Sequence, residues 1–127
     1  MIRNLPRILA VTLGGLAAAV LLAPATLAHH GWAWTTGGNI ELTGTIVAAR
    51  LGNPHGILQV DAGGEVWQVE VGQPWRNAQA GLKDGDLVAG VELTVIGEPA
   101  ADPADRRLKA ERLVIGGRDY LLYPDRS

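Results

Sequence analysis

The chain after residue 38 consists of short runs in which apolar and polar residues alternate, and this period of two most constrains the fold. In the first run, residues 39–51, one face carries Ile40, Leu42, Gly44, Ile46 and Ala48. Such alternation predicts a half-buried β-strand. Gly44, in the middle of the run, predicts a bend or a bulge, as where a strand curls around a barrel corner.

Turn residues separate this run from two further strands. Asn53 and Pro54 break the alternation, which then resumes in residues 56–62 and 65–71. Gly63 and Gly64 lie between these two runs. Two alternating runs joined by so short a glycine-containing connection are typical of a β-hairpin.

The segment GQPWRNAQAG, residues 72–81, is the one candidate helix. Pro74 is suited to a first helical position, and Gly81 can close the helix in a left-handed conformation. Further strands are predicted at residues 87–99, 108–115 and 118–123. In the second of these we expect one face to carry Leu108, Ala110, Arg112 and Val114.

This order of elements predicts the fold class. Three strands, a short helix and then further strands are the order of the OB-fold, a small barrel. We therefore expect an all-β, OB-fold-like barrel of five to six strands, with one short helix between strands 3 and 4. A β-sandwich is the alternative, but one long bent first strand that pairs with both ends of the sheet leaves fewer edges.

Residues 1–28 have the pattern of a secretory signal peptide, expected as a helix ahead of the barrel. Arg3 and Arg7 precede an uncharged apolar run that ends in small residues. We expect cleavage after Ala25 or Ala28, and a domain of residues 29–127 in the periplasm or secreted. The alternative is an uncleaved N-terminal membrane anchor, because residues 8–28 are apolar and about 20 such residues cross a bilayer. Pro24 favours cleavage.

Composition argues against several functional classes. Without the signal peptide, nine basic residues stand against thirteen acidic ones, and the basic residues gather only at Arg106, Arg107 and Lys109. We therefore expect no nucleic-acid partner, and a membrane partner only if the signal peptide is uncleaved. The chain has no cysteine, which excludes disulfides and thiolate metal sites. Its one serine is Ser127 and it has no phosphate-binding loop, so we expect no enzymatic activity.

The three histidines are His29, His30 and His55. Neutral imidazole is a common ligand of copper and zinc and needs no cysteine. The three can converge if the N-terminal segment folds back over the first hairpin. Cleavage after Ala28 would add the free amine of His29, giving a nitrogen set suited to Cu(II), with Zn(II) as the second choice. In the plainer interpretation, His29 and His30 are a processing remnant and His55 is a polar turn residue.

Trp32 and Trp34 follow the histidine pair. They could shield a site or form a ligand-binding face. They could equally anchor the N-terminal segment on the barrel, since each indole buries a large apolar area. Anchoring is compatible with a site, because an anchored segment would position His29 and His30.

Five segments together resemble a bacterial family of small exported domains of unknown function: AHHGW, LTGTI, NPHGILQVD, VWQVEVGQP and LKDGDLVAGVELTVIGEPA. The likeness keeps its order and spacing from His29 to about Tyr123, and the recurrent histidines of the family match His29, His30 and His55. The chain departs from the family pattern at GIL after NPH, at GQPW and at LVAG after Asp86. The resemblance supports the fold and a shared histidine site, and it implies no activity.

We expect a periplasmic module that binds a transition metal through His29, His30 and His55. The alternative is a binding module without a metal, which docks a periplasmic protein partner, a saccharide or a small ligand on the barrel face or beside Trp75. An oxidative copper enzyme with an N-terminal histidine is the least favoured, because so small a domain offers little surface for positioning a substrate.

Overall fold

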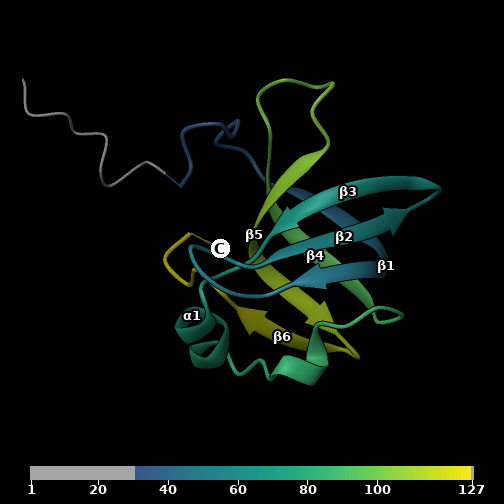
Figure 1. Cartoon of the computed structure of the whole chain (residues 1–127). Helices are drawn as coiled ribbons and strands as arrows, with labels where there is room; N and C mark the ends of the chain where they lie inside the picture. The colour runs from purple at the N-terminus through teal and green to yellow at the C-terminus, as the bar shows by residue number, and fades with distance from the viewer. Residues whose placement is uncertain (1–30, 127) are drawn as a thin grey trace, which may run out of the picture.

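The structure is a computed structural model that describes residues 31–126 (Figure 1). Residues 1–28, predicted to be a signal peptide, lie outside this range together with His29 and His30. The elements are β1 (Ile40–Arg50), β2 (Ile57–Ala62), β3 (Glu65–Glu70), α1 (Pro74–Gln79), a 3₁₀ turn (Asp84–Asp86), β4 (Glu92–Pro99), β5 (Arg107–Ile115) and β6 (Arg118–Leu121).

The strands form one sheet that closes on itself. Its order is β3-β2-β1-β4-β5-β6, and a further parallel pairing between β3 and β5 closes the barrel. The remaining pairings are antiparallel. The result is a closed five-stranded barrel with β6 as an extra strand and α1 between β3 and β4, which confirms the predicted OB-like fold.

β1 pairs along its first half with β4 and along its second half with β2. The two pairings meet near Gly44, where a Cβ atom would lie 2.3 Å from the carbonyl oxygen of Asp61. The register with β2 then shifts between Ile46 and Ala48. Ala48 is consequently exposed instead of continuing the apolar face.

The interior of the barrel is filled by aliphatic side chains from all five barrel strands and from the connections around α1. The largest fully buried apolar residues are Ile46, Leu58, Val60, Val69, Val71, Leu87, Val95, Leu108, Leu113 and Leu122.

The short helix α1 lies at the end of the barrel near β6 and the C-terminal segment (Figure 1). Pro74 occupies its start as predicted, and Gly81 follows it with a positive φ of 97°. The Asn77 side chain accepts a hydrogen bond from Gly72 N (2.9 Å) and donates one to Gly72 O (3.0 Å). These bonds fix the helix to the end of β3.

Two further details differ from the sequence predictions. Residues 87–91 form a loop, in which Gly90 has a φ of 93°, and β4 begins only at Glu92. In β5 the core face runs from Leu108 and Ala110 to Leu113, while Arg112 and Val114 lie off it. The register with β4 shifts so that Glu111 is an extra residue, and an extra residue switches the faces of a strand.

Residues 31–126 contain no helix with the length and apolarity needed to cross a bilayer.

Candidate functional site

Charged side chains are buried on the outer face of the seam between β3 and β5. Val69 and Val71 face the barrel core, so Glu70 between them points to the opposite face. Lys109, between Leu108 and Ala110, does the same, and it is the register partner of Glu70. Glu70 is only 8 % exposed and Lys109 only 3 %. Outward-facing charges are buried only where another part of the chain covers them.

His55 joins this seam from the turn between β1 and β2. The backbone of Gly56 donates to Gly72 O and accepts from Val71 N, both at 2.9 Å, which extends the β2–β3 pairing past the strand ends. This holds His55 beside Glu70, and His55 Nε2 contacts Glu70 Oε1. The imidazole keeps 31 % of its surface exposed. The contact therefore leaves part of the ring accessible from outside.

The second oxygen of Glu70 faces Lys109. Glu70 Oε2 lies 3.7 Å from Lys109 Nζ, a distance for charge attraction and too long for a hydrogen bond. Among the described residues this buried oxygen has no hydrogen-bond partner. Burial lowers the pKa of Lys109 from its ordinary value, although Glu70 acts in the opposite direction. Such a carboxylate oxygen has capacity for a further donor or cation.

Gly31 and Trp32 pack against the Lys109 side of this cluster. A Cβ atom on Gly31 would lie 3.5 Å from Lys109 Nζ. The Trp32 ring lies 5.4 Å from Lys109 Nζ and 4.0 Å from the Arg126 guanidinium, and it meets the Tyr123 ring edge-on at 5.0 Å. These contacts place the start of the described chain directly on the buried charges.

Trp34 and the residues after it fix the same segment to the barrel. The Trp34 ring lies 4.4 Å from the Arg107 guanidinium. Its carbonyl accepts from Ala101 N at 2.9 Å, and Thr36 N donates to Pro99 O at 3.0 Å. Both tryptophans therefore lie on the outside of β5 and its preceding loop, and their role in shielding a site stays a prediction.

A second buried cluster lies beside the first. Arg126 Nη2 donates to Glu98 Oε1 at 2.7 Å, and its Nε donates to Glu111 Oε1 at 3.4 Å. Glu98 also accepts from Thr35 Oγ1 and, at 3.1 Å, from Gly37 N. Burial acts to raise the pKa of Glu98, but the hydrogen bonds from Thr35 and Arg126 together with the Arg126 charge hold it below its ordinary value. This cluster ties both terminal segments to β4.

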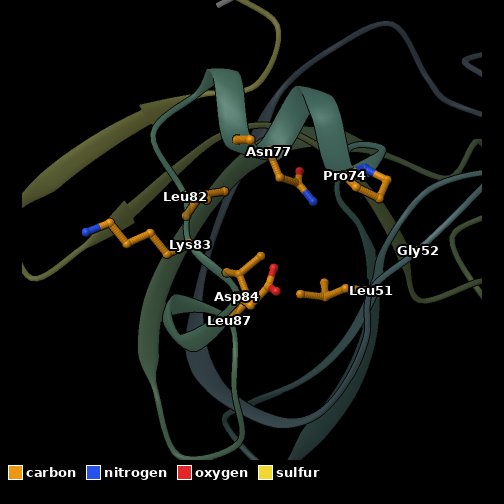
Figure 2. Close-up of a pocket in the computed structure, with 9 residues that line it drawn as sticks. Leu51, Gly52, Pro74, Asn77, Leu82, Lys83, Asp84 and Leu87 are labelled. Atoms are coloured by element: carbon orange, nitrogen blue, oxygen red, sulfur yellow. The ribbon is translucent and has the colours of Figure 1, made fainter.

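A separate hollow of about 270 Å³ lies between α1 and the turn after β1 (Figure 2). Figure 2 shows the Asp84 carboxylate near its centre, with Leu51 on one side and Asn77 above. Leu82, Leu87 and Pro74 add apolar surface, whereas the Lys83 side chain points away. A small ligand with one polar group fits this lining better than a metal ion, since Asp84 is its one acidic residue.

Comparison with known families provides the affiliation. A family model described as a family of unknown function, DUF6152, matches residues 17–108. The chain belongs to this family. The sequence matches none of the curated proteins with which it was compared.

The DUF6152 match includes His29, His30, His55 and Glu70, and it ends at Leu108, one residue before Lys109. Of the three histidines singled out by sequence, the structure describes only His55, and it places that residue against Glu70. Within residues 31–126 no group of three or more histidine and acidic side chains is arranged to hold a metal ion.

Sequence reasoning did not identify Glu70 and Lys109 as part of a site. Glu70 stands on the polar face of an alternating strand, and Lys109 stands between apolar residues in a basic stretch. Their pairing depends on the parallel register of β3 and β5. One available signal was that Glu70 follows Asn-Pro-His by only 15 positions, across the predicted hairpin that returns the chain to that turn.

Proposed function

We propose that this DUF6152 domain is an exported metal-binding module that takes Cu(II) on His29, His30 and His55, with Zn(II) as the second choice. One observation carries the proposal. Gly31 lies against Lys109 in the same buried cluster as His55. Convergence of the three histidines requires the N-terminal segment to return to the turn between β1 and β2, and the position of Gly31 supports that return.

Covalent geometry restricts how far His30 can lie from this cluster. Consecutive Cα atoms across a trans peptide are about 3.8 Å apart, so His30 begins one such step from Gly31. Lys109 connects Gly31 to Glu70, and Glu70 connects Lys109 to His55. The described chain therefore begins, at the residue that follows His30, in a chain of contacts that leads to the partly exposed His55 ring.

The chemistry of these ligands favours copper. Three imidazoles, with the amine of His29 if cleavage falls after Ala28, form a nitrogen set of the kind that Cu(II) prefers. Glu70 supplies a negative charge that offsets the nearby charge of Lys109. Trp32, stacked on Lys109 and Arg126, would cover the site from outside.

Titration of the purified exported protein with Cu(II), followed by quenching of tryptophan fluorescence, tests the proposal. We expect the wild type to saturate at about one equivalent, because one ligand set is present per chain. His55→Ala and His30→Ala should each abolish saturable binding. Gln59→Ala, an exposed neutral position on neighbouring β2, is the matched control and should bind as the wild type does. Absence of saturable binding in the wild type, or unchanged binding in His55→Ala, would contradict the proposal.

The hollow beneath α1 favours a second candidate function, the binding of a small ligand or partner segment without a metal. Its walls are largely apolar, the Asp84 carboxylate provides a charged anchor for a ligand, and Trp75 on the same helix is 55 % exposed. This function predicts affinity for a saccharide, amine or protein partner that persists in chelator and in the triple variant of His29, His30 and His55. Asp84→Asn should weaken it.

A further inference from the structure

We propose that Glu70 positions His55 for metal binding and makes Nδ1 the ligand atom of that histidine. The inference rests on the proposed function and extends it, because it assigns a role to a carboxylate that does not itself hold the metal. Three features of the structure support this role: the contact between His55 Nε2 and Glu70, the burial of the Glu70 carboxylate, and the exposure of the rest of the imidazole.

The contact between His55 and Glu70 is made by one nitrogen only. His55 Nε2 meets Glu70 Oε1. A carboxylate oxygen accepts hydrogen bonds, so we infer that Nε2 is the ring nitrogen that carries the hydrogen toward Glu70. In the neutral ring the lone pair then lies on Nδ1. Metal-ligating histidines typically donate their other ring N–H to a carboxylate or carbonyl, which fixes the tautomer and the ring orientation.

Glu70 is held firmly enough to orient its neighbour. It is the last residue of β3, is only 8 % exposed, and lies in register with Lys109 across the parallel pairing that closes the barrel. Its other oxygen faces Lys109 Nζ at 3.7 Å. Burial in the wall of the barrel therefore restricts the rotamers of Glu70. The charge of Lys109 also attracts the Glu70 carboxylate toward β5.

The rest of the His55 ring remains available to a ligand. Its side chain is 31 % exposed, and His55 also lines a hollow formed by the turn residues between β1 and β2. The Nε2 edge is occupied by Glu70. Coordination through Nδ1 is thus the mode that keeps the Glu70 contact intact.

Two measurements test this role. Long-range ¹⁵N–¹H NMR of the metal-free wild type should show His55 as the Nε2–H tautomer at a pH where the ring is neutral.

The second measurement is the Cu(II) affinity of variants at Glu70. The affinity should fall about 10- to 100-fold in Glu70→Ala, the range typical of losing an outer-shell partner. The loss should be smaller in Glu70→Gln, because the amide oxygen can still accept a hydrogen bond from His55. Glu65→Ala, which removes an exposed carboxylate from the same strand, is the matched control and should keep wild-type affinity.

The outcomes separate the two proposals. A wild type that binds no copper contradicts the proposed function and, with it, the role of Glu70. Copper binding with wild-type affinity in Glu70→Gln and Glu70→Ala contradicts the positioning role alone. If Glu70→Ala does not fold, the wild-type tautomer decides: an Nδ1–H ring in the metal-free protein would overturn the inference.

Discussion

At the scale of single residues, the outer face of the barrel wall contains charged side chains that are buried as deeply as residues of the core. Glu70 meets His55 with one oxygen and faces Lys109 with the other, and Gly31 lies against Lys109 from outside. Burying a charge is costly unless a partner offsets it. At the seam between β3 and β5 the charges of Glu70 and Lys109 therefore offset each other. Buried groups of ionisable side chains of this kind are more typical of functional sites than of structural packing.

Gly44 is a residue at which a single methyl group should matter. A Cβ atom there would lie 2.3 Å from the Asp61 carbonyl oxygen and 2.8 Å from the Val60 side chain. We expect Gly44→Ala to lower the free energy of unfolding by about 1–3 kcal/mol, because the two strands must separate to admit the methyl group. Urea denaturation measures this. Gly38→Ala, with open space around the added atom, is the control and should change stability little; equal stability in both variants would contradict the close approach.

The sequence singled out His55 as a candidate metal ligand, which stays a prediction, and the alternation of residues 65–71 is consistent with Val69 and Val71 on one face and Glu70 on the other. It could not show that Glu70 is buried. Glu70 is paired with Lys109, which is distant along the chain and which Gly31 contacts in turn, and no local pattern encodes such contacts.

At the scale of elements, the segment of residues 31–39 behaves as an external strap on β4 and β5. Thr35 forms an isolated bridge with Ala100, and Trp32 packs on Tyr123 and Arg126. These contacts fix residues 31–39 to a defined part of the barrel surface, and this segment directly follows the histidine pair in the sequence. The proposed metal site would therefore depend on Trp32 as well as on the histidines.

Trp32→Ala should weaken Cu(II) binding at least about tenfold, a free-energy loss of about 1.4 kcal/mol. The reason is that an aromatic contact worth about 0.5–1.5 kcal/mol beyond its buried area no longer holds the strap. Calorimetric titration measures the affinity. Trp75→Ala, which removes a tryptophan that is 55 % exposed on α1, should leave the affinity unchanged. Equal losses in the two variants would contradict a local role for the strap.

Most elements were predictable because their patterns are local. Alternation located β1, β2, β3 and β6, and the proline and glycine positions located α1. The prediction for residues 87–91 was wrong because Gly90 takes a positive φ and the loop bonds to Ile46 instead of continuing β4. The faces of β5 were wrong after Ala110 because a bulge at Glu111 is decided by pairing with β4.

At the scale of the whole molecule, both terminal segments meet on β4 through Glu98. Thr35 and Gly37 reach it from the N-terminal side, and Arg126 reaches it from the C-terminal side. The order of elements was enough to predict an OB-like barrel, since few topologies fit it. The convergence of the two ends could not be predicted, because neither terminal segment has a periodic pattern.

The contacts of Glu98 with Thr35, Gly37 and Arg126 predict that the free energy of unfolding depends on pH. The pKa of Glu98 is held below its ordinary value of 4.5 in the folded protein. The unfolded chain then binds more protons in acid, so the stability from Glu98 is present above about pH 4.5 and is lost as the pH falls through the lowered folded pKa. Glu98→Gln should be less stable at neutral pH and lose less stability in acid, as followed by thermal unfolding across pH. Glu92→Gln, exposed on the same strand, should run parallel to the wild type, and a parallel curve for Glu98→Gln would contradict the assignment.

The central claim is that the N-terminal histidines and His55 hold one metal ion together. The most direct test is the intact mass of the exported protein, taken under native conditions after loading with Cu(II) and removal of free metal. We predict a wild-type chain that begins at His29 and retains one copper ion, together with a His55→Ala chain of the same length that retains none. A wild-type chain that carries no copper, or a His55→Ala chain that retains it fully, would contradict the claim.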